Sequence, residues 1–241
     1  NSKNIVLDSL AIFSDPVDYD AEKEGVQTKG DNAIEIDVNS TGWNTLKVGA
    51  CDVANIQIQN CIIGSDGFTG IHVSAYDGVT FKNNEFEAIF ISAEPNDINW
   101  GASAKFIACK NIKFVQNNFR GDHATLMWLQ ETQNVLLMNN VFWNTNNYVA
   151  AAETETPTAI RLVAQYAKNV QNVGCYYNTF YLAENAAKTE EYRYNFLQFS
   201  NSPDSKGGGS ANNFIDGTIE FMYNNCYSYA ENCKGKDLDP F

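Results

Sequence analysis

The sequence predicts an all-β protein, a single-stranded parallel β-helix of about seven coils with three strands in each coil. Two observations lead to this fold class. A nine-residue pattern recurs seven times along the chain, and a third apolar strand lies between most of the repeats. The pattern is plainest at residues 111–119, which read Asn-Ile-Lys-Phe-Val-Gln-Asn-Asn-Phe. A strand-based repeat without a helical pattern favours a β-solenoid.

Four positions of the pattern recur throughout the chain, counted from Ile112 as position 0. Position 0 is Ile5, Ile56, Val79, Ile112, Val135, Val173 and Ile219. Position +2 is Leu7, Ile58, Phe81, Phe114, Leu137, Cys175 and Phe221. Position +5 is Leu10, Cys61, Asn84, Asn117, Asn140, Asn178 and Asn224. Position +7 is Ile12, Ile63, Phe86, Phe119, Phe142, Phe180 and Cys226.

Each position has a structural interpretation. Apolar residues at 0 and +2 share one face of a strand, because successive side chains point to opposite faces. The Asn at +5 marks a bend, since its amide can satisfy backbone groups and Asn tolerates a left-handed backbone. One such unit cannot bury its own apolar face, so copies must stack. Parallel stacking then predicts an Asn ladder and a Phe stack in the core.

The spacing of the repeats indicates where loops are inserted. Successive position-0 residues lie 51, 23, 33, 23, 38 and 46 residues apart, so the shortest coil has 23 residues and the surplus is loop. Leucine-rich repeat frames are absent from the sequence. A single uninterrupted repeat predicts one β-helix domain over residues 1–241. Because the chain opens at Asn1 inside a repeat unit, we expect that further sequence precedes it.

A third strand is expected between the repeat units, at residues 34–37, 71–74, 89–92, 127–130, 160–163 and 197–200. The insertions flank this strand: about residues 13–33, 143–158 and 181–195 precede it, and about 38–54, 93–110 and 201–217 follow it. Loops carry function more often than the strands they connect. The third strand is therefore the expected floor of a cleft with loops on both sides.

Two outward columns should line this floor. The first is Glu35, His72, Phe90, Trp128, Arg161 and Gln198, and the second is Asp37, Ser74, Ser92, Gln130, Val163 and Ser200. Aromatic rings beside amide and charged groups are typical of a sugar-binding surface. The candidate substrate-binding residues are Phe90, Trp128, Gln130, Gln198, Trp43 and Trp100. Trp43, Trp100 and Trp143 are expected in the flanking insertions, where packing against the outer wall is the alternative role.

The candidate catalytic residues form two groups. Glu35 and Asp37 lie two residues apart on one strand face, about 6.6 Å along the backbone, which suits an inverting glycoside hydrolase. Ordinary surface carboxylates are the alternative interpretation. A β-eliminating lyase would instead need a base and a cation for the substrate carboxylate, and His72 and Arg161 supply these groups several coils apart.

Cofactor requirements are limited to one candidate cation site. Asp15, Asp18 and Asp20 offer the hard oxygen ligands that calcium prefers, although their spacing does not match an EF-hand and a solvated loop is the alternative. Two His residues and no Cys-x-x-Cys argue against structural zinc. Cys226 and Cys233 are the best candidates for a disulfide, whereas Cys61 and Cys175 are expected as small core residues.

Composition restricts the partners. The formal net charge of -13 makes nucleic acid an unfavourable partner. The sequence has no apolar run of 18 residues and no signal peptide, so no membrane span is expected. The oligomeric state is left open.

The repeated Asn-[Ile/Val]-x-[Ile/Phe/Leu]-x-x-Asn-x-Phe units resemble the pectate-lyase-like superfamily of right-handed parallel β-helices. The closing Asp237-Leu238-Asp239-Pro240-Phe241 is similar to the end of secreted bacterial members. This resemblance implies a right-handed solenoid and a cleft along one strand of each coil. The superfamily includes polysaccharide lyases, glycoside hydrolases, carbohydrate esterases, tailspikes and adhesins. The Asn-Thr-Asp, Gly-His-Gly and Arg-Ile-Lys motifs of polygalacturonases are absent, as are the Trp-x-Asp-His and Arg-x-Pro-x-x-Arg motifs of pectate lyases.

Two functions are therefore expected, from different classes. The first is a secreted or cell-surface protein that binds a polysaccharide in the third-strand cleft, with cleavage as a lyase or a hydrolase left open. The alternative is a non-catalytic adhesin or carbohydrate-binding module.

Overall fold

The computed structural model describes residues 4–13, 33–36, 46–51, 55–65, 69–88, 102–121, 125–144, 158–164, 170–182, 195–201 and 215–228. These residues form three parallel sheets and no helix. Sheet A contains β1 (Ile5–Asp8), β4 (Ile56–Gln59), β7 (Val79–Lys82), β10 (Lys110–Val115), β13 (Gln133–Met138), β16 (Val170–Tyr176) and β19 (Ile215–Met222). Sheet B contains β2 (Ala11–Phe13), β5 (Ile62–Ser65), β8 (Glu85–Ala88), β11 (Asn118–Gly121), β14 (Val141–Asn144), β17 (Thr179–Leu182) and β20 (Asn225–Ser228). Sheet C contains β3 (Ile34–Ile36), β6 (Thr69–Ser74), β9 (Ala102–Ile107), β12 (Thr125–Gln130), β15 (Thr158–Ala164) and β18 (Asn195–Asn201).

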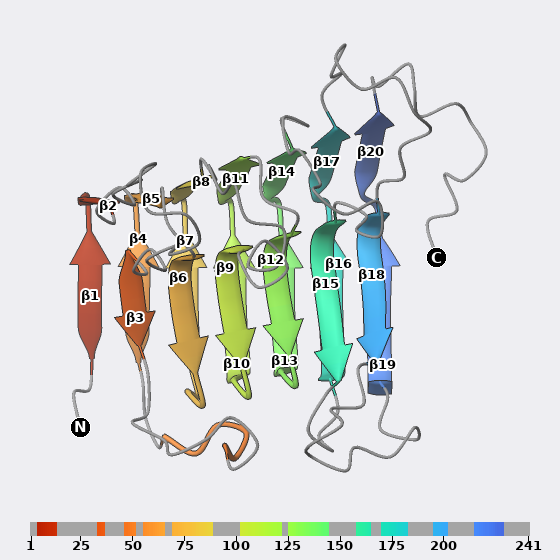
Figure 1. Cartoon of the computed structure of the whole chain (residues 1–241), viewed down its shortest axis with the longest axis horizontal. Coiled ribbons are helices and arrows are strands. Elements are labelled where there is room, and N and C mark those ends of the chain that lie inside the picture. Colours follow the sequence, from red (N-terminus) through yellow and green to blue (C-terminus); the bar gives the residue numbers. More distant parts are fainter. Residues whose placement is uncertain are drawn as a thin grey trace, which may run out of the picture.

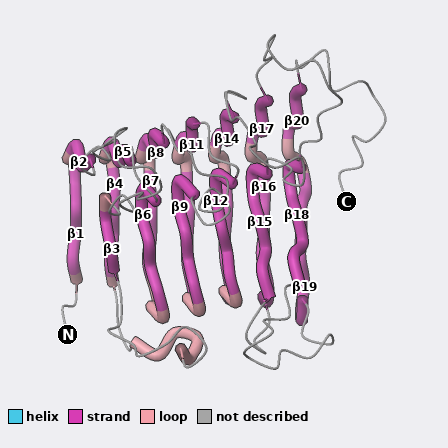
Figure 2. The backbone as a smooth tube through the Cα atoms, in the orientation of Figure 1, coloured by secondary structure: helices cyan, strands magenta, loops and turns pink. Residues whose placement is uncertain are grey.

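The first six coils take one strand from each sheet, in the order A, B, C, and in the described residues the last coil consists of β19 and β20. The chain rises through sheet A, crosses sheet B at the top and descends through sheet C in front, while advancing from β1 toward β20 (Figure 1). This is a right-handed coil. The tube in Figure 2 shows the same strands side by side along the whole solenoid. The predicted all-β parallel β-helix, with about seven coils and three strands per coil, is confirmed.

The repeated apolar positions face the interior. Strand pairing places Ile112 beside Val135 and Phe114 beside Leu137, so equivalent residues of successive coils lie over one another. Position 0 and position +2 are buried from β4 to β16, and they join residues of sheet C in one continuous core. Burial of this shared apolar stripe is what couples each coil to the next.

The Asn column at +5 forms the predicted ladder inside the bend between sheets A and B. Asn117 shows the pattern: its Oδ1 accepts from the backbone N–H of Asn84 at 3.0 Å and from Asn84 Nδ2 at 2.9 Å. Its own Nδ2 donates to Asn140 Oδ1 at 3.0 Å and to the carbonyl oxygen of Phe81 at 3.1 Å. The same bonds recur at Asn140 and Asn178. Each amide therefore satisfies backbone groups of its neighbours that are buried away from water.

Cys61 shows how the ladder tolerates another residue. Cys61 occupies the same position in an earlier coil, where its backbone N–H donates to Asn84 Oδ1 at 3.0 Å. Its thiol lies 3.7 Å from the carbonyl oxygen of Leu7, which is the position +2 carbonyl that an Asn amide would reach. A thiol is a weak donor, so this coil retains the geometry with a weaker bond. The ladder position of the first coil, Leu10, is exposed instead.

The predicted Phe stack at +7 is also present. Phe119 lies between Phe86 and Phe142, with ring centroids 4.5 Å and 4.8 Å away and ring planes within 5° of parallel. Phe180 continues the stack at 4.9 Å from Phe142. A second pair, Phe81 and Phe114, stacks at 4.9 Å in position +2. The centroid spacings match the separation of neighbouring strands, so the backbone repeat itself sets the stack.

The left-handed residue of the bend lies at +4 rather than at the Asn. Positive φ angles near 55° occur at all seven +4 residues, Ser9, Asn60, Asn83, Gln116, Asn139, Tyr177 and Tyr223. The +5 Asn marks the bend, as predicted, but the left-handed conformation that Asn tolerates occurs one position before it. The chain therefore bends at +4 between sheets A and B, and the following Asn points inward and bonds to its neighbours.

The third strand of one coil also differs from the sequence interpretation. Residues 102–107 form β9 and pair with both β6 and β12, although they were expected to be part of an insertion. The segment 89–92, expected as this strand, lies outside the described residues. Trp143 was expected in an insertion but lies in β14, on the outer face of sheet B. Local apolar alternation in 89–92 was misleading, because register with both neighbouring coils decides which segment joins the sheet.

Candidate functional site

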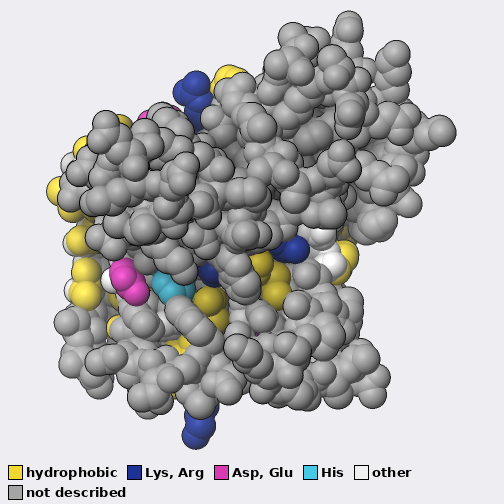
Figure 3. Space-filling model, viewed as in Figure 1, with side chains coloured by type: hydrophobic (Ala, Val, Ile, Leu, Met, Phe, Trp, Pro, Cys, Tyr) yellow, Lys and Arg dark blue, Asp and Glu magenta, His cyan; other side chains and the backbone are white. Residues whose placement is uncertain are grey.

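The outward face of sheet C carries one side chain from each strand in a continuous column, named here the sheet C column. Strand register places these residues side by side in the order Glu35, His72, Lys105, Trp128, Arg161 and Gln198. In Figure 3, acidic, histidine, basic and hydrophobic side chains follow one another across this face of the molecule. Six different residue types occupy six equivalent positions, so the scaffold does not dictate this column.

Lys105 was missed by the sequence interpretation, which placed Phe90 in the same position. Lys105 is in β9 and is only 6% exposed as a whole residue. The number of residues between the third strand and the next repeat unit could have revealed the correct strand. The inward residues Val73, Phe106 and Leu129 each precede the next position 0 by six residues. Applying that spacing upstream of Ile112 would have identified 102–107 as the strand.

Trp128 lies at the centre of the column between two cations. The Lys105 Nζ atom is 5.0 Å from its ring centroid, and the Arg161 Cζ atom is 4.8 Å from it. The Trp128 Nε1–H donates to Gln130 Oε1 at 3.3 Å. Trp128 as a whole residue is only 5% exposed. Its ring therefore serves to hold two cationic side chains in place, and it is not an open platform for a sugar.

Apolar contacts reinforce this arrangement on the outward side. Ala102, Trp128 and Val163 form a buried cluster that is separate from the solenoid core. Leu126 and Ala159, by contrast, belong to the main core. The outward face of sheet C thus has its own small apolar base beneath the charged groups. Cations held over such a base interact more strongly with a ligand charge than they would in open water.

Glu35 and His72 form the acidic end of the column. Glu35 Oε1 is 3.9 Å from His72 Nδ1, with side-chain exposures of 55% and 9%. At this separation the two groups are within ion-pair range but beyond hydrogen-bond distance. This pair has the composition of a proton-transferring dyad.

Arg161 lies too far along the column to act together with His72 on one bond. Lys105 and Trp128 separate them, so three strand spacings, about 14 Å, divide the two side chains. At the far end, the hydroxyl of Thr158 donates to Gln198 Oε1 at 3.2 Å. The structure therefore brings together Glu35 with His72 and Trp128 with Arg161, as two separate groups.

Several candidate residues lie outside the described part of the chain. These are Asp37, Phe90, Trp43 and Trp100, together with Asp15, Asp18 and Asp20 of the candidate calcium site. Cys233, the expected partner of Cys226, is also outside it. Among the residues that the structure describes, no group of three His, Cys, Asp or Glu side chains could hold a metal ion. The same residues include no helix long and apolar enough to span a membrane.

Comparison with known proteins gives one structural match. No family model matches the chain, and no curated protein matches it. A crystal structure from Parabacteroides merdae, provisionally described as a glycosyl hydrolase, matches with 15% sequence identity and a TM-score of 0.37. The match covers 73% of this chain and 73% of the other. A likeness at this level assigns no activity to the present chain.

Proposed function

We propose that the protein binds an acidic polysaccharide along the outward face of sheet C, on the surface of a cell or outside it. The observation that supports this most strongly is the cation–Trp–cation arrangement of Lys105, Trp128 and Arg161. A polymer that lies parallel to the solenoid axis meets one residue of the sheet C column in every coil. Repetition of the coil would thus match repetition of the sugar.

The charge distribution favours an acidic ligand over a neutral one. The whole chain carries a formal net charge of -13, yet three of the six column positions hold His72, Lys105 and Arg161. A group of basic side chains on one face of an acidic protein attracts negatively charged ligands to that face. Sugar carboxylates carry such a charge, and the planar Arg161 guanidinium suits them because it can bind both carboxylate oxygens.

Arg161 is the residue through which the ligand would be bound most directly. It is half-buried, whereas Lys105 and Trp128 are buried beside it. Stacking on the indole fixes the guanidinium before the ligand arrives, which lowers the entropy lost on binding. Glu35 and His72 would lie near another part of the same polymer and are the groups able to transfer a proton.

Binding to a panel of polysaccharides tests the proposal. Polygalacturonate and alginate should bind, more weakly as salt is raised, and Arg161→Gln should reduce affinity about tenfold. The matched control is Arg120→Gln, because Arg120 also stacks on a tryptophan, at 5.2 Å from the Trp143 centroid, but on sheet B. Equal affinity of Arg161→Gln and wild type would contradict the proposal.

The same samples distinguish a binding module from an enzyme. New unsaturated ends would indicate a lyase, and new reducing ends without unsaturation would indicate a hydrolase. In either case Glu35→Gln should abolish turnover while affinity is retained. The alternative, a non-catalytic adhesin or binding module, predicts binding with neither product, and the wide separation of His72 from Arg161 favours it.

A further inference from the structure

A depression lies on the outer face of sheet A, away from the sheet C column. It has a volume of about 380 Å³ and lies over β13, β16 and β19. Its floor is Gly174, which occupies position +1 of its coil. The other coils have a side chain at this position: Val6, Gln57, Thr80, Lys113, Leu136 and Glu220. Glycine weakens a strand interior and often marks a close approach by another group.

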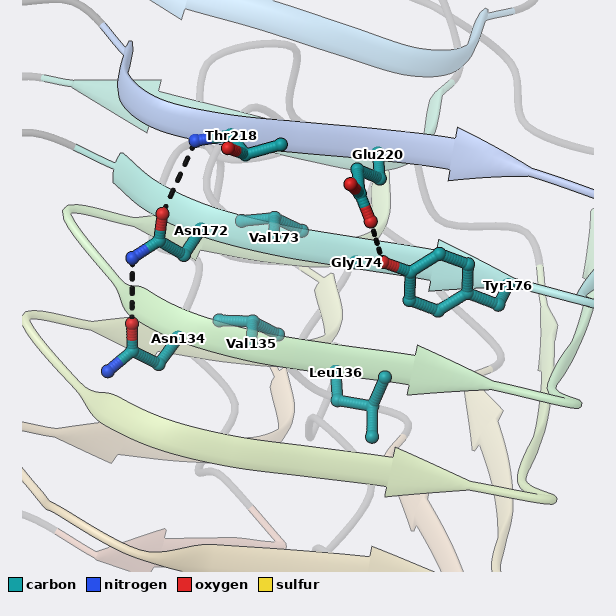
Figure 4. A pocket seen from close by; sticks show the side chains of 9 residues that line it. All are labelled: Asn134, Val135, Leu136, Asn172, Val173, Gly174, Tyr176, Thr218 and Glu220. Atoms are coloured by element: carbon teal, nitrogen blue, oxygen red, sulfur yellow. Dashed lines mark hydrogen bonds between the residues drawn. The ribbon is translucent and has the colours of Figure 1, made fainter.

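The group that approaches Gly174 is the ring of Tyr176. A Cβ atom at Gly174 would lie 2.5 Å from Tyr176 Cε2 and 3.0 Å from its Oη. The ring therefore lies directly on the backbone of β16, with one face against the sheet. Figure 4 looks onto this surface and shows the other ring face open toward the viewer. Only a residue without a side chain allows this position of the ring.

Glu220 holds the far end of the ring. The Tyr176 hydroxyl donates a hydrogen bond to Glu220 Oε2, on the neighbouring strand (Figure 4). This bond, together with burial and the charge of Glu220, raises the pKa of Tyr176 above its ordinary value. The hydroxyl thus remains a donor throughout the neutral pH range. The second carboxylate oxygen of Glu220 is available at the edge of the ring as an acceptor.

The remaining wall combines one apolar and several polar groups. Leu136 lies beside Gly174 in the strand register. Asn172 and Asn134 belong to an outer amide ladder, in which Asn172 Nδ2 donates to Asn134 Oδ1 at 3.0 Å. Each amide nitrogen carries two N–H groups, and this ladder engages one of them. The depression therefore offers a flat ring, a carboxylate acceptor and amide donors.

Exposed aromatic residues continue this surface at the end of the strand. Tyr177 and Tyr223 stack at 5.2 Å and are 57% and 68% exposed. Both have left-handed φ angles, 56° and 59°, which are unfavourable for bulky residues. The other five coils have Ser, Asn or Gln there. These two coils therefore have an exposed aromatic side chain at a position whose backbone conformation disfavours it.

We propose that this depression is a second carbohydrate site, which binds one neutral hexopyranose residue of a glycan against the open face of Tyr176. The apolar C–H face of the sugar stacks on the ring, and its hydroxyls donate to Glu220 and accept from the amide edge. A neutral sugar fits best because the lining carries a carboxylate and amides but no cation. This site is separate from the sheet C column. The proposal that it binds a neutral sugar does not depend on whether an acidic polysaccharide binds to the sheet C column.

Gly174→Ala tests the site without removing any sugar-binding group. The added methyl pushes the Tyr176 ring off the sheet, and the fold should survive because the clash is with the end of a side chain. Cellohexaose and mannohexaose are titrated into the protein and followed by NMR at the tyrosine ring signals. We expect at least one to bind, with affinity about tenfold weaker in Gly174→Ala and Tyr176→Ala.

Gly64→Ala is the matched control. A Cβ atom there would clash with the ring of Phe13 on sheet B in the same manner, so affinity should stay within about twofold of wild type. Thermal unfolding confirms that each variant is folded. Binding of neither hexasaccharide, or equal affinity of Gly174→Ala and wild type, would overturn the proposal.

Discussion

Two columns of residues run along this solenoid and differ in almost everything except their register. The inner column at +5 repeats Asn in five successive coils, and the same hydrogen bond joins each Asn to the next. The sheet C column repeats nothing: it runs from Glu35 through His72, Lys105, Trp128 and Arg161 to Gln198. In both columns the backbone repeat sets the same distance between side chains of successive coils.

The difference separates the demands of folding from the demands of function. Inside the bend, every coil presents the same buried N–H and C=O groups, and Asn satisfies both types at once. On the outward face of sheet C the backbone groups are already paired in the sheet. Side chains there are unconstrained by the repeat, so their charge and shape reflect another requirement. Substitutions in the inner column should therefore lower the stability of the fold, whereas substitutions in the sheet C column should weaken ligand binding and leave stability nearly unchanged.

The largest loss of stability is expected for Phe119→Ala. Phe119 is fully buried between two stacked rings, and its removal leaves a cavity that costs about 4 kcal/mol of unfolding free energy. Urea unfolding measures this change. Phe13→Ala, at an exposed position on sheet B, should cost less than about 1 kcal/mol. Similar losses at the two sites would show that the stack does not stabilise the core.

Asn117→Ala should have the next largest effect, about 3 kcal/mol. The variant loses two side-chain donor bonds and leaves the Asn84 backbone N–H and the Phe81 carbonyl without their partner. Urea unfolding again gives the value. Asn83→Gly is the control, because Asn83 is an exposed +4 residue with φ 54° that glycine adopts readily. An Asn117 loss no greater than the Asn83 loss would argue against the ladder.

Lys105→Met should separate stability from binding. Met fills similar space against Trp128 and removes a buried charge, so the unfolding free energy should change by less than about 1 kcal/mol. Polygalacturonate affinity should fall about tenfold, because one cation of the column is lost. Lys113→Met, at an exposed position of β10, should leave both quantities unchanged. Loss of stability without loss of affinity would make Lys105 a structural residue.

The buried thiols concern neither stability nor binding, and the expected effect is on their chemical reactivity alone. Burial raises the pKa of Cys109 and of Cys175 to about 12, from an ordinary value near 9. The reactive thiolate fraction at pH 8 should then be about a thousandfold lower than in the unfolded chain. Iodoacetamide labelling followed by peptide mass spectrometry should detect these two residues only after denaturation. Rapid labelling of the folded protein at pH 8 would contradict this burial.

The sequence was sufficient to predict the scaffold because the scaffold is repetitive. A residue such as Phe119 has equivalents in other coils, so its inward position could be deduced from several independent copies. The register, the Asn ladder and the Phe stack followed from that comparison. Lys105 and Trp143 were misplaced for the opposite reason: where a loop of variable length intervenes, local apolar alternation does not reveal which segment joins the sheet.

The site could be predicted only in part. The positions of Glu35, His72, Trp128, Arg161 and Gln198 along one column follow from the repeat, and the structure places them there. The burial of Trp128 between two cations could not be deduced, because it depends on Lys105 and on long side chains that adopt many rotamers. The close packing of Tyr176 on Gly174 likewise depends on side-chain placement.

The central claim is that an acidic polysaccharide lies along the sheet C column, and NMR of the indole N–H groups tests it most directly. The chain has four tryptophans, and Trp128→Phe and Trp143→Phe identify two of the four signals. On titration with a galacturonate hexasaccharide, the Trp128 signal should shift while that of Trp143, on sheet B, stays in place. A shift of the Trp143 signal with the Trp128 signal unmoved would contradict the claim.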